Sequence, residues 1–147
     1  MLFVWVANAG RSQIAAELVR QHAGDAVIVR SAGSVPASDI HPGARTVLAA
    51  MGSSGDAYPK PLTDDAVRAA DVVVTMGCGD TRPILPGIRY EDWVVGDPGL
   101  ASHDGVMAIT AQIDAHVRAL LTDLGLPQRP RAPATPVSSP TSTRRCP

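Results

Sequence analysis

Apolar residues along the chain fall into short continuous runs that alternate with segments of helical periodicity. A short continuous apolar run is typical of a strand that is buried on both faces of a sheet. Apolar residues three and four positions apart are typical of a helix packed along one side. The pattern predicts strands over residues 2–6, 26–29, 71–76 and 90–95, and helices over residues 11–23, 42–51, 64–70 and 103–124.

Strands that alternate with helices predict a three-layer α/β fold, with a four-stranded parallel sheet covered by helices on both faces. The chain has 147 residues, which favours one domain, expected over residues 1–126. Parallel sheets of this kind bind ligands at the carboxyl ends of their strands. Three loops are expected to converge there, at residues 7–10, 77–82 and 96–98.

Residues 127–147 differ in composition from the rest of the chain. They contain six prolines, six serines or threonines and no apolar periodicity, which predicts a disordered tail. The tail is either a solvated extension or a weak binding segment for a proline-recognising protein partner. Its four arginines leave residues 1–126 with a net charge of −5, so the body offers no basic face for nucleic acid.

Nothing in the sequence favours a membrane or a resident metal. The apolar start of the chain lacks a basic region and is too short for a signal peptide or a membrane span, so a cytoplasmic protein is expected. The two cysteines, Cys78 and Cys146, do not suggest a disulfide framework. The histidines at positions 22, 41, 103 and 116 lack metal-ligand spacing and are expected on the surface or at helix caps.

The turn between the first strand and the first helix has the composition of an oxyanion cradle. Small residues let backbone N–H groups approach an anion closely, and the start of the helix adds its positive end. The Arg11 guanidinium can grip two anion oxygens, and Asn8 can hold the turn by bonding its own backbone. Taken alone, the segment could equally be an ordinary strand-to-helix turn. The expected oxyanion-binding residues are Ala7, Asn8, Ala9, Gly10, Arg11 and Ser12.

Residues 2–13 resemble the signature loop of low-molecular-weight protein tyrosine phosphatases and of the arsenate reductases that share their fold. That signature is Cys, five residues, Arg, and then Ser or Thr. The segment Met76-Gly77-Cys78-Gly79-Asp80 is similar to the arsenate reductase branch in particular. The resemblance covers nearly all of residues 2–124 and continues through residues 30–34, 59–66, 73–80, 89–93 and 96–98.

The resemblance implies thiol chemistry on a small oxyanion, arsenate or phosphate. A cysteine thiolate attacks the bound anion, with its pKa lowered by the loop amides and the arginine. The aspartate of an Asp-Pro pair, here Asp97, acts as general acid. A resolving thiol completes arsenate reduction, supplied by the protein or by a reductant of thioredoxin, glutaredoxin or mycothiol type. No metal or nucleotide cofactor is implied.

The sequence departs from this pattern at both thiol positions. Trp5 stands where the nucleophilic cysteine is expected, and Arg82 stands where a second cysteine occurs in the related pattern. Cys78 is either an auxiliary thiol or an idle residue, and Asp97 is either the inherited acid or a turn residue before Pro98.

Three hypotheses follow from these departures. The first is a catalytically impaired, arsenate reductase-like protein that still binds an oxyanion. The second is an active reductase or phosphatase that uses another thiol such as Cys78. The third is a structural or interaction protein whose loop is plugged by the Trp5 indole. The direction of that indole separates the first hypothesis from the third, because an indole in the loop occupies the space of the anion.

Overall fold

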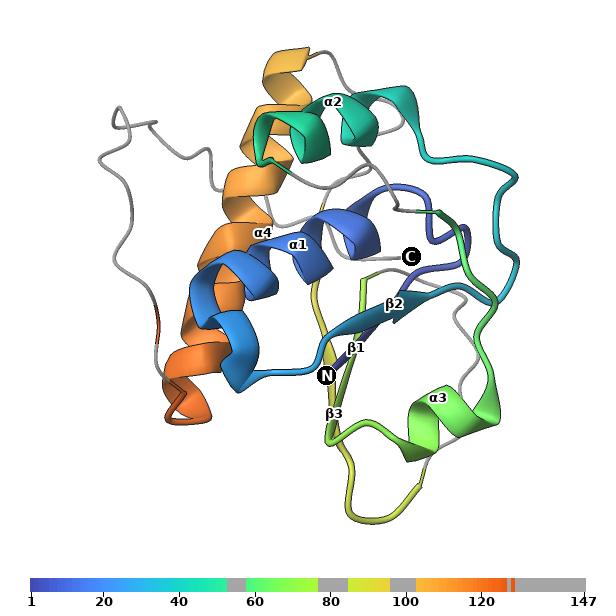
Figure 1. Ribbon diagram of the computed structural model, residues 1–147, viewed down its shortest axis with the longest axis vertical. Helices are drawn as coiled ribbons and strands as arrows, with labels where there is room; N and C mark the ends of the chain where they lie inside the picture. The colour runs from blue at the N-terminus through green and yellow to red at the C-terminus, as the bar shows by residue number, and fades with distance from the viewer. Residues whose placement is uncertain (53–57, 77–84, 96–102, 127, 129–147) are drawn as a thin grey trace.

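The protein, described by a computed structural model, is a four-stranded parallel sheet in the order β2-β1-β3-β4, with helices on both faces (Figure 1). The structure describes residues 1–52, 58–76, 85–95, 103–126 and 128. The strands are β1 (Leu2–Val4), β2 (Arg30–Ala32), β3 (Val72–Thr75) and β4 (Arg89–Asp92). The helices are α1 (Arg11–Ala23), the short 3-10 helix η1 (Gly24–Ala26), α2 (Pro42–Ala50), α3 (Asp64–Arg68) and α4 (His103–Asp123).

Two apolar layers hold the sheet between its helices. The larger layer packs α1, α2 and α4 against one face, where Phe3 and Val74 are fully buried. The smaller layer lies under α3 and takes the alternate residues Leu2, Val4 and Val73. Both faces of β1 and β3 are therefore buried, which accounts for their uninterrupted apolar sequence. The three-layer α/β fold expected from the sequence is confirmed.

The helices follow their sequence signals closely. The first helix has the predicted bounds, and α2, α3 and α4 begin at the predicted residues and end one or two residues early. The start of α3 is capped as its sequence suggests, because the Thr63 hydroxyl accepts a hydrogen bond from the Ala66 N–H at 3.1 Å.

The prediction for the second strand was wrong. The apolar run at residues 26–29 was expected to form it, but the strand is Arg30–Ala32. Parallel pairing sets this position, because Leu2 of β1 lies opposite Arg30 and the neighbouring strand does not extend further back. The residues before Arg30 are consequently left beyond the ladder, and Ile28 is 78% exposed.

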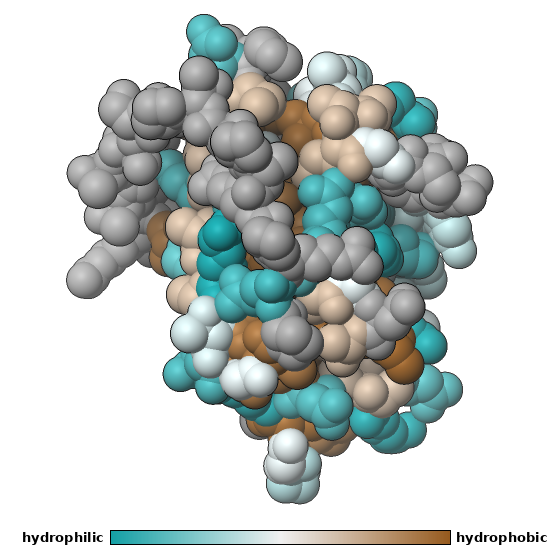
Figure 2. Space-filling model, turned by 60° about the vertical axis from the view of Figure 1, so that its left-hand side comes forward, coloured by the Kyte–Doolittle hydropathy of each residue, from teal (hydrophilic) through white to brown (hydrophobic). Residues whose placement is uncertain are grey.

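The surface mixes polar and apolar side chains over the part of the face drawn in colour in Figure 2. Among the described residues, no helix combines the length and apolar character needed to cross a membrane. Trp93 is buried in the larger layer, with its ring centroid 5.4 Å from that of Phe3.

Candidate functional site

Residues 5–10 form the loop that leaves the carboxyl end of β1 and enters α1. This is the edge of a parallel sheet at which ligands bind. Asn8 adopts a left-handed backbone conformation with a φ of 49°, and it is fully buried. Asparagine tolerates that conformation better than most residues, so its place at the turn has a local cause.

An outer strap, residues 33–41, holds the loop carbonyl groups away from its centre. The N–H groups of Val35, Ala37 and His41 donate to the carbonyl oxygens of Val6, Ala7 and Ala9 at 2.8, 2.9 and 2.8 Å. In a trans peptide the C=O and the following N–H point in opposite directions. The N–H groups of Ala7 and Gly10 are therefore directed toward the inside of the loop, as an oxyanion cradle requires.

Gly33 allows the strap to pass this close to the loop. A Cβ atom at this position would lie 2.4 Å from the Val6 carbonyl oxygen and 2.5 Å from that of Trp5. The strap continues into a parallel bridge between Gly33 and Pro61, so residues 33–34 and 60–62 run side by side behind the loop. Only glycine fits the contact without displacing the loop backbone.

The Asn8 side chain crosslinks the loop to two other segments. Its amide nitrogen Nδ2 donates to the Ser12 hydroxyl at 2.8 Å, and its Oδ1 accepts from the Lys60 N–H at 2.8 Å. The sequence predicted that Asn8 would bond its own backbone, whereas the contacts reach the first turn of α1 and a segment 52 residues away. Ser12 is fully buried by this arrangement.

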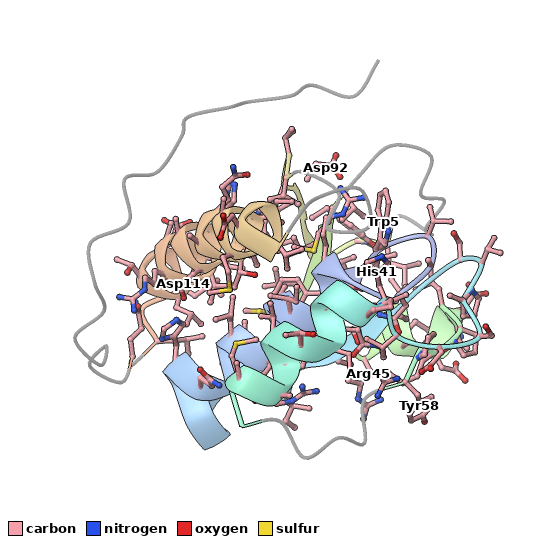
Figure 3. All side chains as sticks on the ribbon, turned by 90° about the horizontal axis from the view of Figure 1, so that it is seen from above. Trp5, His41, Arg45, Tyr58, Asp92 and Asp114 are labelled. Atoms are coloured by element: carbon pink, nitrogen blue, oxygen red, sulfur yellow. The ribbon has the colours of Figure 1, made fainter. Side chains whose placement is uncertain are left out.

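The Trp5 indole lies against the Arg11 guanidinium. The guanidinium carbon is 3.6 Å from the centroid of the indole ring, and the Arg11 side chain also donates from Nη1 to the Val95 carbonyl oxygen at 3.0 Å. Arg11 is buried and Trp5 is half-buried. Figure 3 shows Trp5 at the end of the molecule where His41 caps the start of α2. A stack of this kind is worth about 0.5–2 kcal/mol.

A second cation stands beside the loop. Lys60 donates from Nζ to the Tyr58 carbonyl oxygen at 2.9 Å and lies 4.9 Å from the centroid of the Tyr58 ring. Burial, and to a smaller extent the charge of Arg20, lowers the pKa of Lys60. The Lys60 side chain is thus directed toward Tyr58, while its backbone N–H bonds Asn8 Oδ1 in the loop.

The six residues expected to bind an oxyanion are consecutive, in the loop and at the start of α1, and their role in binding stays a prediction. The structure places the Trp5 indole on Arg11 rather than in the sheet. The expected positions Cys78, Arg82 and Asp97 lie outside the described residues. The segments that lead to them leave the sheet at the same edge as the loop: the Met76 N–H donates to the Val4 carbonyl oxygen, and Val95 is bonded to Arg11.

Two buried polar residues were missed by sequence reasoning. Gln13 was not singled out, although it is 4% exposed and bonds the loop through its side-chain amide. His22, expected at the surface or at a helix cap, lies in the last turn of α1 and is buried against α4, with Nε2 at 2.5 Å from Asp114 Oδ1. No local sequence signal could reveal the contact between His22 and Asp114, because the two residues are 92 positions apart. Within the described ranges, no three His, Cys, Asp or Glu side chains are grouped to hold a metal ion.

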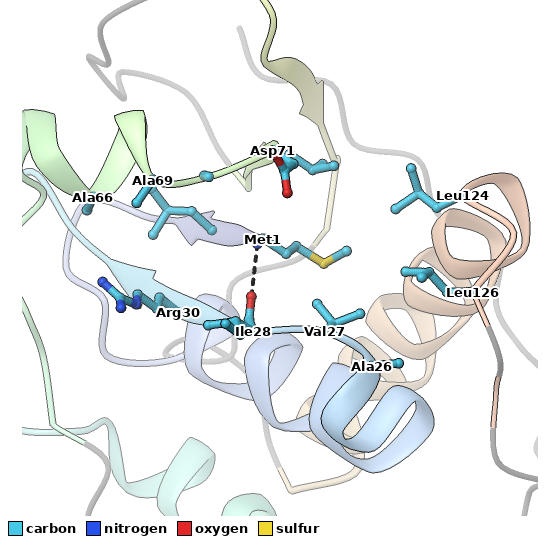
Figure 4. A pocket seen from close by; sticks show the side chains of 13 residues that line it. Met1, Ala26, Val27, Ile28, Arg30, Ala66, Ala69, Asp71, Leu124 and Leu126 are labelled. Atoms are coloured by element: carbon cyan, nitrogen blue, oxygen red, sulfur yellow. Dashed lines mark hydrogen bonds between the residues drawn. The ribbon is translucent and has the colours of Figure 1, made fainter.

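A cavity of about 620 Å³ lies at the opposite edge of the sheet (Figure 4). Its walls are mainly apolar and come from the start of β1, residues 26–30, residues 66–72 and the chain after α4. The amino group of Met1 donates to the Ile28 carbonyl oxygen there at 3.0 Å. None of the expected site residues lines this cavity, so the candidate site is the loop.

Comparisons with known proteins agree on one family. Residues 1–129 match the family model for low molecular weight phosphotyrosine protein phosphatase. A putative arsenate reductase from Halobacterium salinarum is 30% identical over 124 residues, which cover 78% of this chain and 85% of that protein.

Two solved structures of similar fold are also arsenate reductases. The thioredoxin-dependent arsenate reductase of Corynebacterium glutamicum shares 48% identity over 84% of this chain, with a TM-score of 0.72. The present chain spans 60% of the length of that Corynebacterium protein. An arsenate reductase in its phosphate-binding state shares 25% identity over 83% of this chain and 95% of its own, with a TM-score of 0.70.

Proposed function

Because the chain belongs to the low molecular weight phosphotyrosine protein phosphatase family, we propose that it is an arsenate reductase-like protein that binds an oxyanion, arsenate or phosphate, and is catalytically impaired. One observation carries this proposal. The loop after β1 directs the N–H groups of Ala7 and Gly10 inward beside Arg11, but an indole rather than a thiol projects from its first residue onto Arg11.

The impairment follows from the chemistry of residue 5. The family reaction begins with a thiolate that attacks the bound oxyanion. The lone pair of the indole nitrogen belongs to the aromatic ring, so Trp5 supplies no such nucleophile. The expected resolving position carries Arg82. Asp97 keeps the position of the general acid, but without a covalent intermediate there is no leaving oxygen for it to protonate.

Binding is supported by what the loop retains. The inward N–H groups of Ala7 and Gly10, the amino end of α1 and the Arg11 guanidinium together form an anion site. The indole stacks on the face of the Arg11 guanidinium, whereas an oxyanion bonds its N–H edge, so the two compete for the space inside the loop and the anion binds when the indole moves aside. Neither a metal nor a nucleotide is part of this proposal, and a thiol reductant is needed only if another thiol restores the reaction.

The test is a calorimetric titration of the intact chain with phosphate, with arsenate and with sulfate. Saturable binding that Arg11→Gln abolishes is expected, because the variant removes the guanidinium and keeps a polar side chain. Arsenate reduction with thioredoxin, glutaredoxin or mycothiol is expected at background. Turnover that disappears on Cys78→Ser would instead establish the second hypothesis, an active enzyme with another nucleophile.

A structural or interaction role is the second candidate, and the Trp5–Arg11 stack also favours it. This role predicts no oxyanion binding by the intact chain or by a Trp5→Ala variant that folds normally. The expectations of a cytoplasmic location and of a weak protein partner for residues 127–147 stay predictions.

A further inference from the structure

A buried glutamine lies where the oxyanion loop, α1 and residues 58–60 meet. Gln13 is on the first turn of α1 and is 4% exposed. Its amide nitrogen Nε2 lies 3.0 Å from the Asn8 carbonyl oxygen, 3.1 Å from Asn8 Oδ1 and 2.9 Å from the Tyr58 carbonyl oxygen. The Gln13 side chain therefore contacts both the backbone and the side chain of Asn8, the loop residue with a positive φ. It also contacts residues 58–60, which form the rim beside the loop.

The surroundings of Nε2 require a donor. All three neighbouring atoms are oxygen acceptors, and an amide NH2 group supplies two N–H donors for them. A carboxylate in the same place would set negative oxygens against acceptor oxygens, and an apolar side chain would leave buried acceptors without this donor. The chemistry of the site thus favours an amide over the other side chains of similar length.

The bonds of Gln13 and Asn8 form one continuous network. Asn8 Oδ1 receives both Gln13 Nε2 and the Lys60 N–H, while Asn8 Nδ2 donates to Ser12. A left-handed non-glycine residue persists when surrounding contacts hold it in place. If Asn8 leaves this conformation, the peptide groups on either side rotate, and the next peptide groups, which carry the inward N–H groups of Ala7 and Gly10, are displaced with them.

We propose that Gln13 is a positioning residue for the oxyanion loop, which acts through Asn8 on the direction of the loop amides and through Tyr58 on the rim that carries Lys60. This inference rests on the proposed oxyanion binding and names the residue that maintains it. Gln13 does not touch the anion. Its loss is expected to weaken anion binding much more than it weakens the fold.

The chain offers a matched control on the same helix. Gln21 also donates from Nε2 to a backbone oxygen, that of Met51, at 2.6 Å. Gln13→Met and Gln21→Met each replace an amide by an apolar side chain of similar length. In a Trp5→Ala background, where the indole no longer competes, Gln13→Met is expected to weaken the phosphate Kd at least tenfold, and Gln21→Met is expected to change it less than twofold.

Two further readouts separate positioning from a general loss of stability. In a Trp5→Cys background, Gln13→Met is expected to raise the pKa of the new thiol toward its free value of about 8.5, because the loop amides no longer face the sulfur. Hydrogen exchange of the Lys60 N–H in the otherwise unchanged chain is expected to accelerate on Gln13→Met and not on Gln21→Met. This second readout needs no ligand.

A Gln13→Glu variant keeps the test valid if Gln13→Met does not fold. Its carboxylate repels the three acceptors at neutral pH, and protonation restores one donor. In the Trp5→Ala background, the affinity of Gln13→Glu for sulfate, which does not titrate in this range, is expected to recover as the pH falls from 8 to 5.5.

The outcomes are distinct. An unchanged phosphate Kd, thiol pKa and Lys60 exchange rate in Gln13→Met would overturn the positioning role while leaving the proposed function intact. Absence of phosphate binding in Trp5→Ala itself would overturn the proposed function, and the Lys60 exchange rate would then decide whether Gln13 shapes the loop.

Discussion

Removal of the Trp5 side chain is expected to tighten oxyanion binding. The indole stacks on the face of Arg11, with its ring centroid 3.6 Å from the guanidinium carbon. An oxyanion bonds the N–H edge of the guanidinium, and we expect it to need the space that the ring fills inside the loop, so that it binds after the indole has moved. The stack is worth about 0.5–2 kcal/mol. When a binding-competent state is only partly populated, the apparent Kd rises in proportion. The same energy therefore corresponds to a phosphate Kd about 2- to 30-fold lower in Trp5→Ala than in the intact chain.

The assay is calorimetric titration with phosphate, supported by fluorescence. The chain has two tryptophans, and Trp93 is buried in the core, so Trp93→Phe leaves Trp5 as the only indole reporter. Phosphate is expected to shift its emission to longer wavelength as the ring leaves Arg11 and enters water. Val35→Ala is the matched control, because Val35 is an apolar residue of the outer strap that is 68% exposed.

An unchanged phosphate Kd in a folded Trp5→Ala variant would refute the competition between indole and anion. Weaker binding would show that the indole belongs to the anion site instead of covering it. With an unchanged Kd the emission of Trp5 is expected to stay constant during the titration, whereas an indole that contacts the anion is expected to change its emission without moving into water.

Four other changes have expected outcomes. Trp5→Cys is expected to produce a thiol with a pKa below the free value of about 8.5 and to restore aryl phosphatase activity before arsenate reduction, measured by iodoacetamide reactivity and p-nitrophenyl phosphate hydrolysis. Gly33→Ala is expected to destabilise the fold by about 3 kcal/mol in urea unfolding, because its Cβ would meet two loop carbonyl oxygens at 2.4 and 2.5 Å; a change below about 0.5 kcal/mol would contradict the close contact. Burial lowers the pKa of His116, so its imidazole binds a proton more readily in the unfolded chain than in the folded one. The free energy of unfolding is therefore expected to fall as the pH drops below 6.5. Urea unfolding between pH 5 and 7.5 is expected to show a smaller fall in this free energy for His116→Phe. Truncation after Leu126 is expected to leave the melting temperature within about 2 °C in calorimetry, and a larger drop would show that residues 127–147 pack on the body.

Local sequence signals explain most of the secondary structure. The bounds of α1 follow from a helical pattern between two glycine-containing turns, and the start of α3 follows from the Thr63 cap. The second strand was misplaced because an apolar run reports burial, whereas the position of a strand depends on which neighbour it pairs with. Pairing with Leu2 begins at Arg30, and that information lies 28 residues away.

The sequence by itself determined the fold class, the family resemblance and the composition of the oxyanion loop, because these depend on patterns within short segments. The tertiary structure alone decided which way the Trp5 indole turns and what holds the loop open. Arg11 is bonded to Val95, 84 residues later, and Gln13 to Tyr58, 45 residues later. A side chain in a loop has several low-energy rotamers, and contacts of this sequence separation select among them only after the sheet has assembled.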